Sequence, residues 1–194
     1  HATAESMAYY RARAAGGVGL VTVEMAAPEP AGKHRRFELG ISDDRFLPGL
    51  AQLAGVIHAE GAKASIQLGH GGGHTRIDIC GETPVAPSDI PHSVQEGHTE
   101  IIVPQAMTVE RISQTVQAFA DAANRAARAG FDAVEIHGAH GYLLSQFMSP
   151  VENRRVDEYG GCLENRARIS IEIVRAVLAA GGWIEAADTV YAAP

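Results

Sequence analysis

The segment His137-Gly138-Ala139-His140-Gly141-Tyr142 brings together side chains whose types could do chemistry. Two neighbouring imidazoles can donate paired hydrogen bonds to one carbonyl oxygen and stabilise negative charge that develops on it. A phenol, with an ordinary pKa of ~10, is a competent general acid for a carbanion-like carbon. Such a carbonyl clamp beside a proton donor is what reduction of an activated C=C bond requires. A histidine-rich turn with a packed tyrosine explains the same residues, and residue types alone leave both interpretations open.

Gln67 is a second candidate, because it ends a segment that we expect to be a strand. Its amide offers both a donor and an acceptor, which suits the pyrimidine edge of a flavin or a nucleobase. The alternative is an amide that caps neighbouring backbone groups.

A metal site is a third interpretation, since four histidines and one carboxylate fall near expected strand ends: His70, His74, His137, His140 and Glu24. Zinc commonly binds histidine and carboxylate ligands. However, no HExxH motif is present, and His137 and His140 are not spaced four apart on a helix. We therefore predict no metal, and a metal-dependent barrel hydrolase remains the least favoured alternative.

The composition excludes several classes of protein. The chain has 194 residues, of which 46% are hydrophobic and 20% charged, with a formal net charge of −7. The acidic balance and the scattered Lys and Arg residues argue against a nucleic-acid surface. No apolar run approaches the ~20 residues that cross a bilayer, so we expect no membrane association. Cys80 and Cys162 form no CxxC pair, and no signal peptide is visible, which favours a cytoplasmic location.

The elements that must position these side chains alternate along the chain. Helix propensity and apolar periodicity predict helices over residues 4–15, 49–60, 108–129 and 163–180. Short runs rich in β-branched residues predict strands over residues 18–24, 63–68 and 131–137, while residues 25–48 and 69–107 look like loops. This order implies parallel strands with right-handed crossovers, in either an open doubly wound sheet or a (β/α)8 barrel.

Two observations bear on that choice. No GxGxxG follows a strand, so a dinucleotide-binding Rossmann site is unsupported. Polar residues gather where strands should end, as barrel enzymes require: Glu24, Gln67, His70, His137 and His140. A densely polar run over residues 153–168 is expected to form a structural network, with Asp157 and Glu164 pairing with Arg154, Arg155 or Arg166, although it could also bind an anionic substrate tail.

Several ordered motifs together resemble the Old Yellow Enzyme family of FMN-dependent ene-reductases, also described as NADH:flavin oxidoreductases. The resemblance spans residues 8–180 and rests on YYRAR and GGVGL at 9–20, QLGH at 67–70, APS at 86–88, AGFDAVEIHGAHGYLL at 129–144, QFMSP at 146–150, NRRVDEYGG at 153–161 and ENR at 164–166. It implies a (β/α)8 barrel. The histidine pair resembles the bacterial branch, which includes 2,4-dienoyl-CoA reductases.

The resemblance also implies a role for each matching residue. Gln67 would hydrogen-bond the flavin of FMN, and Met25 and Ala26 would touch it through their backbone. His137 and His140 would hold the carbonyl of a small enone or enoyl substrate. Tyr142 would protonate the α-carbon while reduced flavin, supplied by NAD(P)H, gives hydride to the β-carbon.

Departures from the family pattern set further expectations. His70-Gly71-Gly72-Gly73 replaces a frequent His-x-Gly-Arg, although Arg76 lies close by. We expect residues 1–180 to be a partial TIM barrel, with strands two to four and helices one to four. Residues 181–194 are expected to be a divergent tail that does not supply the next strand. The first strand and the second half of the barrel would then lie outside this chain, so the alternative is an inactive half-barrel that self-associates as a homo-oligomer or pairs with another chain.

Overall fold

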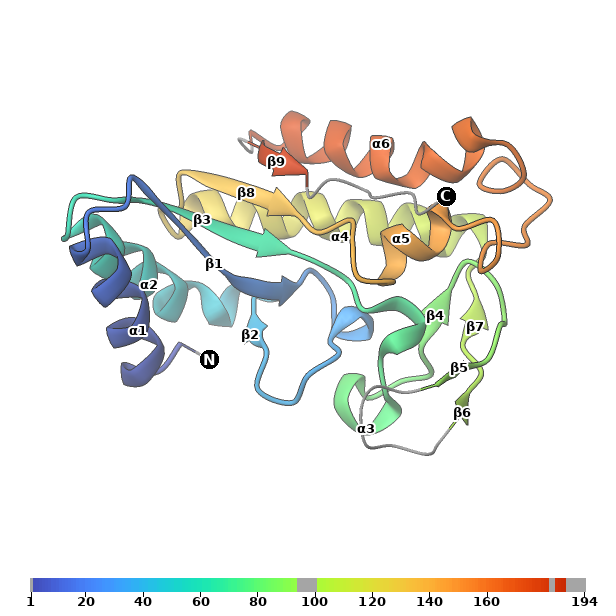
Figure 1. The fold of residues 1–194 in the computed structure, drawn as a ribbon, viewed down its shortest axis with the longest axis horizontal. Coiled ribbons are helices and arrows are strands. Elements are labelled where there is room, and N and C mark those ends of the chain that lie inside the picture. Colours follow the sequence, from blue (N-terminus) through green and yellow to red (C-terminus); the bar gives the residue numbers. More distant parts are fainter. Residues whose placement is uncertain (1, 94–100, 182–183, 188–194) are drawn as a thin grey trace.

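A parallel sheet forms the centre of the protein, seen in a computed structural model that describes residues 2–93, 101–181 and 184–187. Its five strands stand in the order β2-β1-β3-β8-β9, and each neighbouring pair is parallel (Figure 1). The strands are β1 Leu20–Ala27, β2 Leu39–Gly40, β3 Lys63–Leu68, β8 Ala133–Ile136 and β9 Ile184–Ala187. The all-parallel order confirms the predicted α/β architecture.

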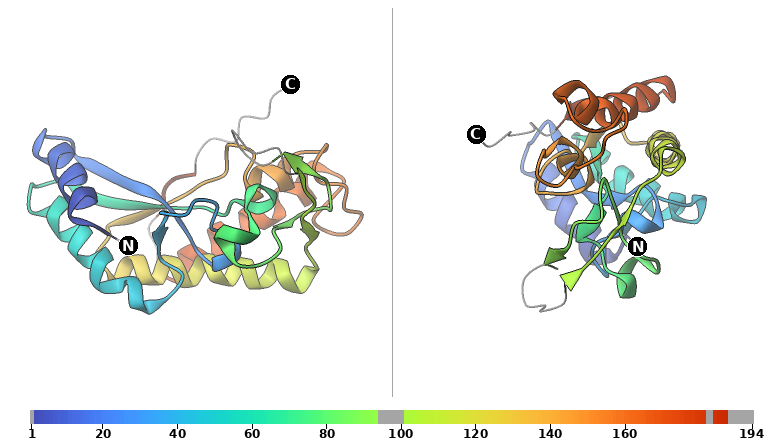
Figure 2. Two further views of the ribbon diagram at one scale, coloured as in Figure 1. Left: turned by 90° about the horizontal axis from the view of Figure 1, so that it is seen from below. Right: turned by 90° about the vertical axis from the view of Figure 1, so that its right-hand side faces the viewer.

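Four long helices flank the strands: α1 Ala4–Ala15, which precedes β1, and α2 Leu47–His58, α4 Val109–Arg128 and α6 Leu163–Ala179, which lie between strands in the sequence. Figure 1 shows α4 behind the strands and α6 along one side of the sheet, and in the left view of Figure 2 both α2 and α4 lie below the strands. Two of these helices have side-chain N-caps. Thr3 caps α1 in a capping box with Ser6. Thr108 caps α4 by accepting a hydrogen bond from the Arg111 backbone N–H.

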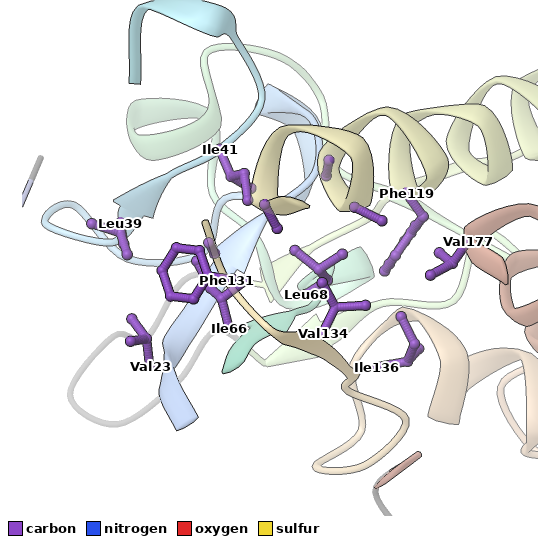
Figure 3. Packing of buried hydrophobic residues seen from close by; sticks show 14 of the residues in the cluster. Val23, Leu39, Ile41, Ile66, Leu68, Phe119, Phe131, Val134, Ile136 and Val177 are labelled. Carbon is purple, nitrogen blue, oxygen red and sulfur yellow. The ribbon is translucent and has the colours of Figure 1, made fainter. Parts of the chain in front are cut away.

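The core lies between the sheet and these helices. Alternate residues of the strands point into it, including Val23, Ile66 and Val134, which are 0–2% exposed. Figure 3 shows Leu68 and Val134 close to Phe119 of α4. The residues between them, such as Thr22 and Glu24 of β1, face the other side of the sheet and are exposed. One face of the sheet is therefore packed and the opposite face is polar, as in one arc of a barrel wall.

The two long connections contain short elements that the sequence did not predict. Residues 25–48 contain β2, η1 Pro30–Gly32 and η2 Asp44–Phe46. Residues 69–107 contain η3 Gly72–His74, α3 Ile77–Cys80 and two small pairs of strands, β4 Val85–Ala86 with β7 Gln105–Ala106 and β5 His92–Ser93 with β6 Ile101–Ile102. Elements of two to four residues are too short to show a hydrophobic period.

One expectation about the tail is wrong. Residues 184–187 form β9, which pairs with β8 through Val134 opposite Ile184 and Ile136 opposite Ala187. The tail therefore supplies the next parallel strand, which sequence reasoning missed because four residues with two alanines carry almost no strand signal. The division of the chain at residue 180 stays a prediction, and residues 182–183 and 188–194 lie outside the described part.

The part of the chain that the structure describes contains no helix that is a candidate for crossing a membrane. None of the helices there combines the length and the apolar character that crossing a bilayer requires.

Candidate active site

A cavity of about 390 Å³ opens where β1, β3 and β8 end. Five of the residues singled out in the sequence line it: Met25, Gln67, His137, His140 and Tyr142. Glu24 lines it too, so the polar residues predicted at three successive strand ends meet in one place, with the exception of His70. The remaining wall is formed by residues 34–38, which belong to the connection between β1 and β2.

His137 and His140 face each other across the mouth of this cavity. His140 Nδ1 lies 3.2 Å from His137 Nε2, so the two rings share one hydrogen bond. His137 continues the ladder of β8, since its backbone N–H donates to the Leu68 carbonyl oxygen. His140 has φ of +57°, a left-handed conformation that non-glycine residues seldom adopt. This turn brings the second imidazole back over the first, three residues after the strand.

Tyr142 is 7% exposed, and its ring lies edge-on to His137 with centroids 5.2 Å apart. Its hydroxyl lies 2.9 Å from Nε2 of His34. Since the Tyr142 ring is packed and its hydroxyl hydrogen-bonded, the phenol occupies one defined position at the end of the cavity. The predicted carbonyl-binding pair and the predicted acid are thus neighbours.

His34 and Glu38 are the site residues that sequence reasoning missed. His34 Nδ1 lies 3.0 Å from Glu38 Oε2, and the same oxygen accepts the backbone N–H groups of His34 and Arg35. Both side chains are at most 5% exposed. They lie in a segment that looked like a loop, and Tyr142 is 108 positions away from His34. The sequence offered no periodic signal to connect them.

Gln67 stands on the polar face of the sheet, where its Nε2 donates to Glu135 of β8. Gln67 thus lies near the end of β3 and lines the cavity, while its role toward a flavin stays a prediction. An amide that lines a cavity and offers donor and acceptor atoms fits the pyrimidine edge of FMN. To donate to the flavin, the Gln67 N–H group would give up its hydrogen bond to Glu135. Met25 lies beside it in the cavity wall.

Two expected residues do not reach the cavity. Ala26 is 0% exposed and belongs to the core, although its backbone lies at the end of β1. His70 turns away, so that its Nε2 lies 3.3 Å from Glu29 Oε1, on the far side of the loop. The four histidines thus do not converge, and within residues 2–93, 101–181 and 184–187 no three His, Cys, Asp or Glu side chains are arranged to hold a metal ion.

Glu29 ties the loop that carries His34 to helix α4. Arg111 donates to both of its carboxylate oxygens, at 3.1 and 2.8 Å, and Thr115 donates at 2.8 Å. Burial opposes ionisation of this carboxyl, but His70 and Arg111 outweigh it and lower the pKa of Glu29 to about 2. Glu29 is therefore a permanent anion that fixes one end of the cavity wall.

The polar run after α5 (Leu143–Met148) forms part of the predicted structural network, since Asp157 pairs with an arginine while Glu164 makes no ion pair with Arg154, Arg155 or Arg166 among the described contacts. Arg155 binds Asp157 and also donates to the Pro87 carbonyl oxygen, while the Arg154 backbone N–H donates to Ser88 Oγ. Arg166 donates to the Met148 carbonyl oxygen. These bonds hold the loop after β8 against the segment around β4.

Comparison with known proteins agrees with this geometry. Residues 1–190 match the family model described as the NADH:flavin oxidoreductase / NADH oxidase family. The NADPH dehydrogenase of Halalkalibacterium halodurans is 46% identical over 168 residues, which cover 87% of this chain and 47% of that protein. The chain thus spans about half the length of the curated relatives it matches.

Solved structures show the same relation. The Old Yellow Enzyme homologue of Zymomonas mobilis superimposes with a TM-score of 0.85 at 32% identity, over 94% of this chain and 52% of that one. Morphinone reductase in complex with tetrahydroNAD gives a TM-score of 0.82 at 33% identity, over 91% and 52%. This chain covers about half of each of these two structures, which is consistent with the predicted partial (β/α)8 barrel. Together with the match over residues 1–190, they show that the chain belongs to the NADH:flavin oxidoreductase / NADH oxidase family.

Proposed function

We propose that the protein containing this chain is an FMN-dependent oxidoreductase that reduces the activated C=C bond of small α,β-unsaturated carbonyl compounds with hydride from NAD(P)H. The observation that carries this proposal is the meeting of His137, His140 and Tyr142 in one cavity. The family, and the similarity to an NADPH dehydrogenase and to a morphinone reductase that holds tetrahydroNAD, support the hydride donor.

The two imidazoles would bind the substrate carbonyl. Their facing nitrogens, 3.2 Å apart, now satisfy each other. When the ring that accepts this bond changes tautomer, so that both facing nitrogens carry a proton, a carbonyl oxygen between them would accept two hydrogen bonds in place of this one. Negative charge grows on that oxygen as the C=C bond is reduced, so the paired donors stabilise the transition state more than the substrate.

Tyr142 would supply the proton. Its hydroxyl faces the same cavity, where it can donate to the α-carbon of a substrate held by the histidines. FMN, when bound, supplies the hydride for the β-carbon. Gln67 and Met25, which line the same cavity, would hold the flavin ring, Gln67 through its side-chain amide. The cytoplasm is the proposed location, supported by two free cysteines, Cys80 and Cys162.

The test uses the complete protein loaded with FMN, with cyclohexenone as substrate and NAD(P)H as reductant. We expect ketone-dependent oxidation of NAD(P)H. In Tyr142→Phe, flavin reoxidation by cyclohexenone should slow by about 10²-fold or more, since general acids typically contribute 10²–10⁴-fold, while flavin reduction stays unchanged. Absence of bound flavin and of ketone-dependent turnover would remove the proposed function. An equal slowing of both half-reactions would remove Tyr142 as the acid.

A second candidate follows from the open sheet, whose described strands run from β2 to β9 without closing into a ring. In it, the 194-residue chain is an inactive half-barrel that persists by pairing with a second copy or another chain, because unpaired strand edges favour association. Its test concerns the whole molecule and is given in the Discussion.

A further inference from the structure

The hydroxyl of Tyr142 is attached to a buried pair of titratable side chains. Tyr142 Oη lies 2.9 Å from His34 Nε2, and His34 Nδ1 lies 3.0 Å from Glu38 Oε2. The side chains of His34 and Glu38 are 5% and 3% exposed. The proposed catalytic mechanism uses neither of them, yet they form a continuous hydrogen-bonded line that ends at the proposed acid.

The donors around His34 define where its protons are. Glu38 is an acceptor, so Nδ1 carries a proton and donates it to Oε2. The Nε–H of Arg35 is always a donor and lies 3.1 Å from Nε2, so Nε2 presents its lone pair. In this arrangement His34 is neutral, and its single Nε2 lone pair is shared by the Arg35 Nε–H and the hydroxyl proton of Tyr142. That proton then points at His34 and away from a substrate in the cavity.

The surroundings of Glu38 give a reason why His34 can also adopt a protonated, cationic form. The bonds of Glu38 all go to Oε2, while its buried Oε1 has no hydrogen-bond partner among the described residues. Arg35 is exposed, and its guanidinium group donates to His34 and not to Glu38, which accepts only the Arg35 backbone N–H. A buried carboxylate is costly unless a cation accompanies it, and His34 is the neighbouring side chain that can become one.

We propose, on the basis of the proposed function, that His34 is the positioning residue of Tyr142 and that its protonation decides where the phenol proton points. When Nε2 gains a proton, it donates to Tyr142 Oη and the exposed Arg35 moves off that nitrogen. The phenol's own O–H is then free to face the substrate. When His34 is neutral, the Tyr142 proton is engaged with His34. When His34 is cationic, the Tyr142 proton can be donated to the substrate.

The proton balance of the step is closed. Tyr142 gives its O–H proton to the α-carbon, and the proton on His34 Nε2 moves to Oη. Tyr142 is thereby restored as a phenol. His34 ends neutral, with a proton on Nδ1 that it still donates to Glu38. Solvent then returns one proton to Nε2, which accounts for the one proton that each reduction consumes. No free phenolate has to form.

The charges facing His34 predict opposite effects for its two polar neighbours. The Glu38 carboxylate favours the cationic imidazole, and the Arg35 guanidinium disfavours it. Around Tyr142 stand three more histidines, His74, His137 and His140, with ring centroids 5.2–6.2 Å from the Tyr142 ring. Each of these rings can also change its protonation state, so only variants at the pair itself identify the group responsible.

The experiment measures flavin reoxidation by cyclohexenone against pH in the complete FMN-loaded protein. We expect a rate that is high at low pH and falls through one histidine titration. Arg35→Gln should shift this fall to higher pH and Glu38→Gln to lower pH. His34→Gln keeps an acceptor and a donor for Tyr142 but does not titrate, so the pH dependence should vanish. Its rate at low pH should drop by about 10- to 100-fold, the value of a hydrogen bond to a developing charge.

His58→Gln is the matched control. His58 also pairs with a carboxylate, since its Nε2 lies 2.7 Å from Asp132 Oδ2, but it lies on α2 and does not line the cavity. This variant should keep the wild-type profile. The absorbance of bound flavin, recorded for every variant, shows whether each one folds and binds FMN.

A second measurement needs no turnover. The ¹⁵N chemical shifts of the histidine rings, recorded against pH, report which nitrogen carries the proton, and the His34 signals are identified by their loss in His34→Gln. We expect a neutral form with the proton on Nδ1, whose Nε2 shift changes in Tyr142→Phe but not in His58→Gln.

Three results would overturn the proposal: a wild-type pH profile in His34→Gln, an unmoved profile in both Arg35→Gln and Glu38→Gln, or a His34 whose neutral form carries its proton on Nε2. A wild-type protein that binds no flavin or does not respond to cyclohexenone refutes the proposed function instead. The ring-nitrogen measurement then still decides how His34 and Tyr142 share their proton.

Discussion

Among single residues, Glu29 makes a two-point ion pair that holds the loop carrying His34 and Glu38. Its carboxylate is clamped by both guanidinium N–H groups of Arg111 and accepts a third bond from Thr115. Such two-point pairs combine energy with a fixed direction. The position of the cavity wall therefore depends on one carboxylate on the opposite side of the loop.

The ionisation of Glu29 makes stability depend on pH with a known sign. Its pKa is lowered from 4.5 to about 2, so the folded state binds its proton less readily than the unfolded state. The contribution is fully present above the unfolded pKa of 4.5 and is lost as the pH falls toward about 2. It amounts to about 2–3 kcal/mol at neutral pH.

Glu29→Gln should therefore lower the free energy of unfolding by about 2–3 kcal/mol at pH 7, and by much less near pH 2. Urea unfolding at both pH values measures this. Glu60→Gln is the control, because Glu60 pairs with an Arg11 whose side chain is 62% exposed, and exposed pairs contribute about 0–1 kcal/mol. An equal loss in both variants, or the same loss at both pH values, contradicts the prediction.

At the scale of elements, the turn η3 brings the segment after β3 against the helix that follows Tyr142. Gly72 has φ of +59°, and a Cβ there would lie 2.3 Å from Gln146 Oε1 and 3.0 Å from the Leu143 Cα. The adjacent Gly73 N–H donates to the same Gln146 oxygen. A side chain at Gly72 would thus meet both a buried amide and helix backbone.

Gly72→Ala should cost about 3 kcal/mol or more of unfolding free energy, since left-handed strain of about 1–2 kcal/mol adds to overpacking of about 1–3 kcal/mol. Gly61→Ala separates the two effects, because Gly61 has φ of +86° but nothing within 4 Å of its added Cβ. That variant should show the strain alone. Thermal unfolding of both proteins measures the difference, and equal losses would mean that crowding at Gly72 relaxes freely.

At the scale of the whole molecule, the sheet is one arc of a barrel with a polar inner face. Thr22 and Glu24 are exposed on that face, and Gln67 and Glu135 are half-buried. Strand β2, at one edge of the described sheet, has two residues, and β9, at the other, has four. Both edges present backbone groups that a further strand could pair with.

The 194-residue chain by itself should therefore elute in gel filtration as a dimer or larger species, and it should bind added FMN weakly or not at all. The physical reason is the open sheet, which leaves strand edges and one face to be covered by association. A monomer that holds FMN tightly would contradict this prediction and the half-barrel alternative with it. The complete protein, run on the same column, is the control.

Sequence periodicity located the long elements well. The predicted helix over residues 4–15 and strand over 63–68 have the observed bounds, and the other long helices begin or end within about three residues of them. The reason is that each long element must bury one apolar face, and that requirement is written as a period of 3.6 or 2. Strands β2 and β9 are too short to show a hydrophobic period, so it is their pairing with longer neighbouring strands that makes them strands.

The amino-acid sequence by itself determined the α/β alternation, the parallel sheet, the family and the positions of Gln67, His137, His140 and Tyr142 at strand ends. Those properties depend on local spacing along the chain. The tertiary structure alone decided that His70 faces Glu29 while His34 reaches Tyr142 and is itself bound by Glu38. A side chain in a loop has no periodicity to reveal its direction, and contacts across 108 residues arise only when the strands pack.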